Sequence, residues 1–319
     1  MVQSYCTLCD WSYAAKALAL YRSLERHAGD FVLWLLPLDE QTLRSFERLA
    51  LPGVRLVSLA DLEPRSMLAD LQAGRIHRWW CFTLASVLCD NLLSWSASTS
   101  IMYLDADTFL FSSPELVFGE IELCGASIAA VPHRFPPRYV HYVDRGYFNV
   151  SSVYFRNDDA GRGCAGRWAA QCIARCDEST VGDQLYLDDW GSIYGERFHA
   201  IVHRGYGVGP WHCHDPSLFL DGYQLVLFHA HELRVAVEGD RHNLFRIGDG
   251  AYEWIQEWVE MPVEIKVERI GDLVPTAENM KGLWRLTDYP LCAEAVGKVY
   301  YPYVAALEQD QGCLERIMA

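Results

Sequence analysis

The first 62 residues alternate between short apolar runs and amphipathic stretches, and this alternation restricts the possible folds more than any other feature of the chain. Apolar runs that predict strands lie at 2–8, 31–38 and 54–62. The stretches between them, 13–27 and 39–49, repeat apolar residues at helical spacing and predict helices. Successive strand–helix–strand units form a parallel sheet covered by helices, whose ligands bind beyond the carboxyl ends of the strands. The opening therefore predicts an α/β fold.

The rest of the chain continues this pattern and then changes character. We expect helices at 77–93 and 163–176, and strands at 101–111, 126–135, 147–156 and 223–233. Past residue 245 the pattern becomes helical and aromatic, without an internal repeat or a low-complexity linker. The chain has 319 residues, 51% of them hydrophobic, which suits one large α/β domain with additions. We predict a catalytic domain at 1–245 and a C-terminal helical extension at 246–319 packed on it.

Charge and cysteine content argue against several classes of protein. The formal net charge of −15 disfavours broad electrostatic binding to nucleic acid. Most of the 11 cysteines have apolar neighbours, as buried reduced thiols do, and the CxxC of Cys6 and Cys9 lacks a second CxxC for a zinc site. We see no signal peptide and no uninterrupted apolar segment of about 18 residues. We therefore expect a cytoplasmic protein without a transmembrane span.

The segment IMYLDADTFLF at 101–111 places two carboxylates in an apolar run. Asp105 and Asp107 lie two positions apart, so an extended strand would point both to the same side. Such a pair suits a divalent cation that also binds phosphate oxygens. A second interpretation is structural, because acidic residues that end a strand often cap a turn.

The same segment also resembles the Asp-x-Asp-x-Thr nucleophile motif of haloacid-dehalogenase phosphatases, and GDQLYLDD at 182–189 imitates their later acidic motif. Those phosphatases need a lysine between the two acidic motifs. This chain has no lysine between Lys16 and Lys266. The phosphatase interpretation therefore stays an alternative, and the other motifs must decide.

Five segments together carry a more specific resemblance. They are TLCDWSYAAKALALYRSL, YLDADTFLF, FNVSSVYF, GDQLYLDDW and LVLFHAHEL. Their order and approximate spacing resemble those of nucleotide-sugar glycosyltransferases with the GT-A fold, and look most like the retaining, glycogenin-like family 8 enzymes. The resemblance covers residues 1 to about 235. It implies a Rossmann-like, mostly parallel mixed sheet with flanking helices, and a hexosyltransferase that uses Mn²⁺ or Mg²⁺ and a nucleotide diphosphate sugar, with a UDP-sugar as the leading donor.

The resemblance assigns roles to eleven positions. The implied donor-binding residues are Thr7, Asp10, Tyr13, Arg78, Asp105 and Ala106, the implied metal ligands are Asp105, Asp107 and His229, and the implied catalytic residues are Asn149, Asp183 and Gln184. Two departures from the family pattern point to a distant relative. Val150 and Ser151 replace a Ser-Gly after the asparagine, and Glu232 stands where a glycine is usual. His231 shares a strand face with His229 and is the alternative ligand.

Basic residues in an acidic chain are the remaining candidates for anion binding. Arg75 and Arg78 precede the aromatic WWCF, where arginine would give bidentate phosphate contacts, and we favour Arg78. The alternatives are a solvated helix start and a cation–π stack within RWW. The loop at 132–149 concentrates further basic residues among tyrosines and is a candidate acceptor site; its basic residues are His133, Arg134, Arg138, His141 and Arg145.

A second loop, GYGVGPWHCHDP at 205–216, offers Trp211 as a sugar platform. His212 and His214 have metal-ligand spacing but no acidic or cysteine partners, so we interpret them as loop polarity. A glycan, a glycolipid precursor, a protein or a modified nucleobase is each a possible acceptor, and the oligomeric state is not indicated. The segment GDQ with Asn149 predicts retention of the anomeric configuration, whereas Asp188 or Asp189 would be the base of an inverting enzyme. A non-catalytic sugar-binding protein on a transferase scaffold is the remaining alternative.

Overall fold

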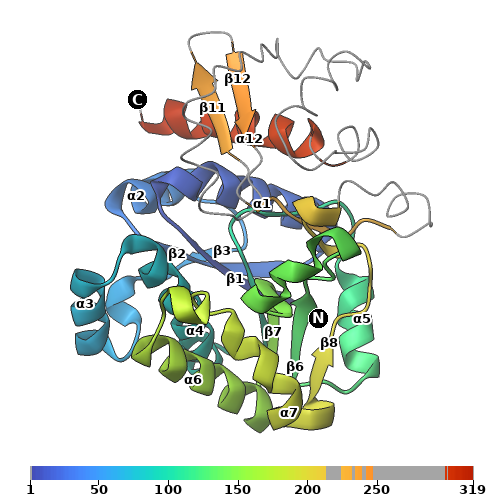
Figure 1. The fold of residues 1–319 in the computed structure, drawn as a ribbon. Coiled ribbons are helices and arrows are strands. Elements are labelled where there is room, and N and C mark those ends of the chain that lie inside the picture. The colour runs from blue at the N-terminus through green and yellow to red at the C-terminus, as the bar shows by residue number, and fades with distance from the viewer. Residues whose placement is uncertain are drawn as a thin grey trace.

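A computed structural model of the protein describes residues 2–212, 224–231, 234–238, 242–246, 299 and 301–318. Its centre is a seven-stranded sheet in the order β3-β2-β1-β4-β7-β6-β8 (Figure 1). The sheet strands are β1 (Gln3–Cys9), β2 (Phe31–Pro37), β3 (Val54–Leu56), β4 (Ser100–Leu104), β6 (Ile128–Pro132), β7 (Phe148–Arg156) and β8 (Phe198–Ala200). Only β7 runs against its neighbours, because it pairs antiparallel with β4 and β6 while the other pairs are parallel.

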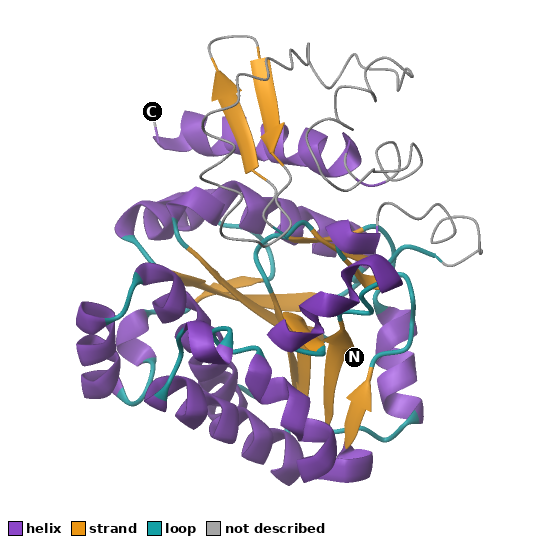
Figure 2. Ribbon diagram, viewed as in Figure 1, coloured by secondary structure: helices purple, strands orange, loops and turns teal. Residues whose placement is uncertain are grey.

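Helices cover both faces of this sheet (Figure 2). They are α1 (Ala14–His27), α2 (Glu40–Leu49), α3 (Arg65–Gly74), α4 (His77–Trp95), α5 (Glu115–Leu123), α6 (Asp159–Ala174), the short α7 (Trp190–Tyr194) and the C-terminal α12 (Tyr301–Met318). No described helix is both long enough and apolar enough to cross a membrane. The predicted α/β sandwich with a mostly parallel sheet is confirmed.

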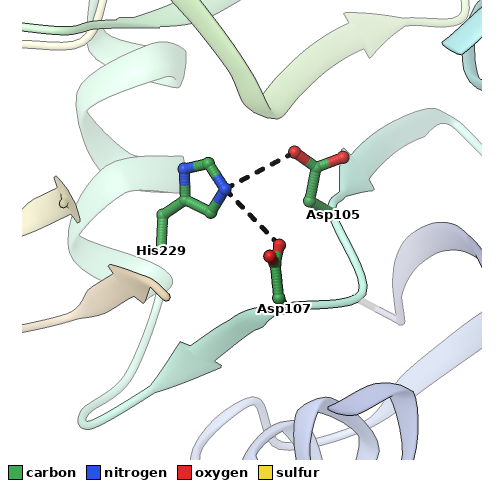
Figure 3. Close-up of side chains that lie close together, drawn as sticks. All are labelled: Asp105, Asp107 and His229. Atoms are coloured by element: carbon green, nitrogen blue, oxygen red, sulfur yellow. Dashed lines mark ion pairs between the residues drawn. The ribbon is translucent and has the colours of Figure 1, made fainter. Parts of the chain in front are cut away.

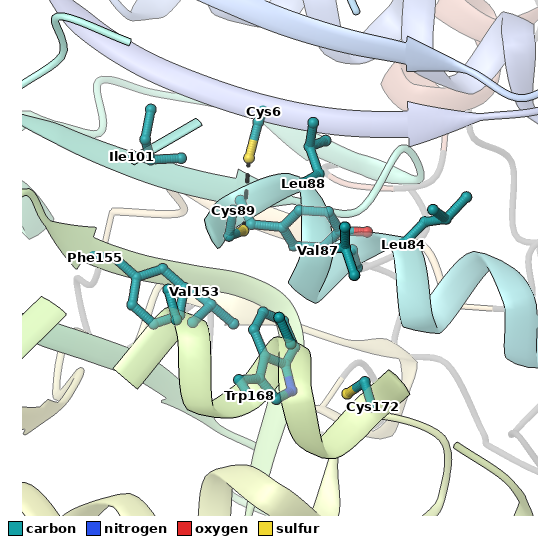
Figure 4. Close-up of a cluster of buried hydrophobic side chains, with 14 of the residues drawn as sticks. Cys6, Leu84, Val87, Leu88, Cys89, Ile101, Val153, Phe155, Trp168 and Cys172 are labelled. Carbon is teal, nitrogen blue, oxygen red and sulfur yellow. Dashed lines mark hydrogen bonds between the residues drawn. The ribbon is translucent and has the colours of Figure 1, made fainter. Parts of the chain in front are cut away.

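The alternation of side chains along the buried strands explains the two layers. In β1, Cys6 packs in the core shared with α4 and α6, whereas its neighbour Tyr5 packs in the core shared with α1 and α5. Figure 4 shows the first of these cores, which contains Trp168 and in which the Cys6 and Cys89 sulfurs lie 3.8 Å apart. Cys6 and Cys9 are buried free thiols, so the interpretation of the CxxC as core is confirmed.

A second, three-stranded sheet stands beside the end of β4. It has the order β5-β10-β9, with β5 (Thr108–Leu110), β9 (Tyr206–Val208) and β10 (Leu227–His229). β11 (Arg234–Glu238) and β12 (His242–Arg246) form an antiparallel hairpin. The short strand at 227–229 replaces the longer strand predicted at 223–233.

The C-terminal helix α12 packs along α1 (Figure 1). Arg22 of α1 donates to the Asp310 carboxylate at 2.5 Å, and Arg48 of α2 donates to the Ile317 carbonyl at 2.6 Å. The predicted boundary at residue 245 stays a prediction, and residues 247–298 of the predicted helical extension lie outside the described residues.

Candidate active site

Asp105 and Asp107 lie in a turn and not in an extended strand. β4 ends at Leu104 and β5 begins at Thr108. The backbone N–H and the hydroxyl of Thr108 both donate to the Asp105 carbonyl, at 3.0 and 2.7 Å, and close the turn. The expectation that strand alternation aligns the two carboxylates is therefore wrong about the local backbone. The turn brings the carboxylates together instead.

His229 completes a cluster with these two aspartates (Figure 3). Its Nε2 atom lies 3.4 Å from Asp107 Oδ1 and 3.8 Å from Asp105 Oδ2. Strand pairing fixes this position, because β10 pairs antiparallel with β5 and sets His229 opposite Thr108. The Ala230 N–H also donates to the Asp107 carbonyl at 2.9 Å. The structure thus selects His229 rather than His231 for the cluster.

The cluster fits a divalent cation. Its two carboxylates and one imidazole offer ligand atoms that all lie within 4.8 Å of one another. Hard oxygen donors suit Mg²⁺ and Mn²⁺, and an imidazole nitrogen suits transition metals such as Mn²⁺. Among the residues that the structure describes, these three form the group of acidic and histidine side chains able to hold a metal ion.

A neighbouring cation and a hydrogen-bond donor offset the negative charge of the two carboxylates. Lys16 Nζ lies 3.8 Å from Asp107 Oδ2, and the Tyr103 hydroxyl donates to Asp105 Oδ1 at 2.9 Å. Burial alone would raise the pKa of Asp107, but His229 and Lys16 lower it overall. Burial also opposes charge on His229, yet the two aspartates raise its pKa. Asp107 is therefore held ionised.

Asp183 presents a contrasting carboxyl group close to Asp105. It is 3% exposed, and its Oδ2 atom has no hydrogen-bond partner in the part of the chain that the structure describes. Burial, with the nearby charge of Asp105, raises the pKa of Asp183 well above its ordinary value. The Trp168 indole N–H donates to the Asp183 carbonyl at 2.9 Å, and Gly182 before it has a φ of +71°, where a Cβ would meet the Phe82 ring. The backbone therefore holds this carboxyl in an apolar position.

The other predicted catalytic side chains contact the loop at 132–149. Gln184 donates from Nε2 to the Arg145 carbonyl at 2.7 Å. Asn149 accepts the Ser151 N–H on Oδ1 at 2.7 Å, so its Nδ2 is the donor to His133 Nε2 at 2.8 Å. Both residues have ordered orientations, and their predicted catalytic roles stay predictions.

Three of the predicted donor-binding residues, Thr7, Asp10 and Tyr13, lie at or just after the end of β1. The Thr7 hydroxyl is buried and has no hydrogen-bond partner among the residues described. Asp10 caps the short helix η1 (Trp11–Tyr13) and lies 2.7 Å from His77 Nε2. Burial alone would raise the pKa of Asp10, but hydrogen bonds from Ser12 and His77 lower it overall. Tyr13 is exposed at the start of α1, whereas Ala106 is buried between the two aspartates.

The two candidate phosphate-binding arginines have separate environments. Arg75 turns away from the cluster and donates to Thr83 and to the Cys172 and Ile173 carbonyls near the end of α6. The Arg78 guanidinium lies over the Trp79 ring, 3.9 Å from its centroid. The cation–π alternative therefore describes Arg78, and its predicted phosphate contact stays a prediction.

Two residues of the candidate acceptor loops, Arg134 and Trp211, are more covered by the protein than expected. The Arg134 guanidinium donates to the His203 and Tyr206 carbonyls, so its charge supports a neighbouring loop. Trp211 is 6% exposed and donates to the His133 carbonyl at 2.8 Å. It therefore does not offer an open face as a sugar platform. His212 accepts the Gly209 N–H at 3.0 Å, which is loop polarity as predicted, and His214 lies outside the described residues.

Sequence reasoning missed Lys16 and misjudged the charge of His133. Lys16 is three residues after Tyr13 on a predicted helix, so the YAAK spacing was the available signal for a pair on one face. His133 had been grouped with basic residues. Burial instead lowers its pKa to about 3, and it stacks on Phe135 with ring centroids 4.6 Å apart.

Comparisons with known proteins agree with this geometry. No family model matches the chain. The uncharacterized protein YfnF of Bacillus subtilis is 27% identical over 252 residues, which cover 74% of this chain and 83% of YfnF. YfnD of the same organism is 25% identical over 291 residues, covering 86% of this chain and 91% of YfnD. The apo structure of mouse xyloside xylosyltransferase 1 is similar with a TM-score of 0.50 and 15% identity, over 73% of this chain and 98% of that chain.

The described residues therefore have the GT-A fold of nucleotide-sugar glycosyltransferases, and the predicted resemblance is confirmed at the level of the fold. The fold does not favour the haloacid-dehalogenase phosphatase alternative. The chain's similarity to the two Bacillus proteins carries no further functional information, since both are uncharacterized.

Proposed function

We propose that the protein is a metal-dependent glycosyltransferase that moves a hexose from a nucleotide diphosphate sugar, with UDP as the nucleotide, to a hydroxyl acceptor. The observation that carries the proposal is the Asp105, Asp107 and His229 cluster next to the end of β4 in a GT-A fold. Ligands of such sheets bind at the carboxyl ends of the strands. Slow hydrolysis of the donor in the presence of Mn²⁺ would distinguish this enzyme from a sugar-binding protein without activity.

We assign different parts of the donor to different groups of residues. Asp105, Asp107 and His229 would hold Mn²⁺ or Mg²⁺, which offsets the negative charge that develops on a departing diphosphate. Thr7, Asp10 and Tyr13 lie at the end of β1, where the nucleoside would bind. Arg78 and Ala106 flank this space in our assignment.

We further propose that the transfer retains the anomeric configuration. An inverting enzyme needs a carboxylate poised to deprotonate the acceptor. The Asp188 carboxylate instead accepts the Tyr147 N–H at 2.9 and 3.0 Å and the Phe148 N–H at 3.2 Å. Because these hydrogen bonds occupy Asp188, we do not assign it as the base. In our proposal Asp183, Gln184 and Asn149 orient the sugar. The acceptor proton goes to the departing phosphate oxygen on the same face of the sugar.

The acceptor is the less defined substrate. The exposed His141 and Arg145 in the 3₁₀-helix η3 (Pro137–Arg145) support an anionic acceptor near Gln184, which contacts the same helix. A glycan, a glycolipid precursor, a protein or a modified nucleobase each carries a suitable hydroxyl. A cytoplasmic location is part of the proposal, as the compartment that supplies nucleotide sugars.

A thermal-shift screen of UDP- and GDP-sugars with and without Mn²⁺ tests the function. We expect a UDP-hexose to stabilise the protein only when Mn²⁺ is present, and the winning donor to be hydrolysed slowly. Asp107→Asn should remove both effects, whereas Asp70→Asn, an exposed α3 residue, should leave them unchanged. Metal-independent donor binding that survives Asp107→Asn would refute the proposal.

Proton NMR of the first-formed product tests the stereochemistry. An α-linked donor should give an α-glycoside. A β-glycoside would exclude retention and move the search for the base to Asp189.

A further inference from the structure

Lys16 is the only lysine in the first 265 residues, and its side chain is 11% exposed. It lies in the first turn of α1, where its ammonium group sits between two partners. One is Asp107, whose Oδ2 atom is 3.8 Å away, and the other is the Tyr13 ring, whose centroid is 4.0 Å away. A lysine is rarely buried without a charged partner, so the pairing with a candidate metal ligand requires a physical explanation.

In the metal-free protein this ammonium group offsets one of the two carboxylates of the cluster. When a divalent cation occupies the cluster, the same ammonium lies a few ångströms from a dication and repels it. A positive charge placed there therefore lowers metal affinity. An anion that binds near both the ammonium group and the dication would offset this repulsion.

The position of Lys16 indicates which anion that is. On one side, Asp10 and Tyr13 mark the end of β1, where the proposed nucleoside binds. On the other side lies the cluster that contains Asp107. A nucleotide sugar that spans these two anchor points carries its diphosphate between them. The ammonium of Lys16 lies along that path.

We propose that Lys16 is an exchangeable counter-cation, which holds Asp107 before the metal binds and binds the diphosphate oxygens of the donor afterwards. The inference rests on the proposed function. Lys16 lies outside the metal cluster and forms an ion pair with Asp107. Lys16 thereby links metal occupancy to donor binding, since each of these ligands changes the environment of the same ammonium group.

The test uses the full chain and two neutral variants, Lys16→Met and Lys16→Gln, with Lys16→Arg as the matched control. Calorimetry measures Mn²⁺ binding alone, and then UDP and GDP binding at saturating Mn²⁺. We expect the neutral variants to bind Mn²⁺ several-fold more tightly and the preferred nucleotide about tenfold more weakly, because charge-assisted phosphate contacts are strong. Lys16→Arg should keep both affinities within a few-fold of the wild-type values.

The two shifts of opposite sign distinguish this role from a structural one. Weaker binding of both ligands, unchanged affinities, or loss of the folded circular dichroism signal in both neutral variants would each overturn the inference. If the wild-type protein binds Mn²⁺ and nucleotide while the variants do not differ from it, only the inference fails. A wild-type protein that binds neither ligand would overturn the proposed function as well.

Discussion

Two acidic sites lie close together in this molecule, and their surroundings shift the pKa of a carboxyl group in opposite directions. Asp107 has Lys16 and His229 beside it, and its pKa is lowered. Asp183 is buried, one of its carboxyl oxygens has no partner among the described residues, and its pKa is raised. In the first site, positive neighbours keep Asp107 ionised before any ligand arrives. The second leaves a polar group for a ligand to satisfy.

The largest expected effect comes from breaking the compensated site. Asp107→Asn removes a ligand and a charge, so Mn²⁺ affinity should fall at least about 100-fold, beyond the losses typical of outer-shell changes. Calorimetry at pH 7.5 measures it, with Asp70→Asn as the control for a lost surface carboxylate. An unchanged dissociation constant would show that the cluster is not a metal site.

The support behind the compensated site gives the second prediction. Tyr303 of α12 is fully buried, with its ring centroid 5.4 Å from that of Phe109 and 6.2 Å from that of Phe228. These phenylalanines lie two residues after Asp107 and directly before His229. Tyr303→Ala should lower the free energy of unfolding by about 3–5 kcal/mol, because it opens a cavity.

Tyr303→Phe is the matched control, measured with Tyr303→Ala by urea denaturation. Among the described residues the Tyr303 hydroxyl is buried without a hydrogen-bond partner, so its removal should change the free energy of unfolding by less than about 1 kcal/mol. Equal losses in both variants would mean that the hydroxyl, and not the ring, supports the strands.

The sequence predicted those helices in which apolar residues repeat at regular helical spacing. The helices at 14–27, 40–49, 77–95 and 159–174 agree with the predicted helices to within a few residues, because their apolar faces repeat regularly. The turn at Asp105 escaped detection, since YLDADTFLF is apolar on both sides and reads as one strand. A turn of this kind is set by hydrogen bonds from Thr108, which the pattern does not encode.

The site could be predicted only in part, for reasons of register and distant contacts. Asp105 and Asp107 come from a local motif, but the choice of His229 over His231 depends on the pairing of β10 with β5. Arg134 and Trp211 looked like exposed ligand-binding residues. Arg134 is half-buried and Trp211 is buried, and each contacts a segment 69 to 78 residues away in the chain, which no local pattern reveals.

Competition between protons and Mn²⁺ for the ligands of the cluster should have a smaller effect than Asp107→Asn. Burial raises the pKa of Asp105 to about 6, although His229 and Tyr103 oppose the shift. Below this pKa a proton occupies Asp105, and His229, whose pKa is raised, is protonated over the same range. Mn²⁺ affinity should therefore fall by between about tenfold and a hundredfold per pH unit as the pH drops from 6 to 5. Calorimetry between pH 5 and pH 8 measures this, and a constant affinity over the range would contradict it.

The smallest expected effect concerns the uncompensated site. Because the folded protein raises the pKa of Asp183 above its unfolded value, the folded state favours the protonated form. Ionisation then costs stability as the pH rises above about 4, the pKa of an unfolded aspartate. Asp183→Asn removes this cost, so the metal-free variant should melt a few degrees higher than the wild type at pH 8 and at the same temperature at pH 4. Asp107→Asn should melt lower than the wild type at both pH values, because the pKa of Asp107 in the folded protein lies well below 4 and its ionised form still stabilises the fold at pH 4. Melting curves of both variants at the two pH values decide the matter. If both substitutions move the melting temperature in the same direction at pH 8, the two carboxyl groups do not differ in compensation, and Asp183 is then held by contacts within the chain.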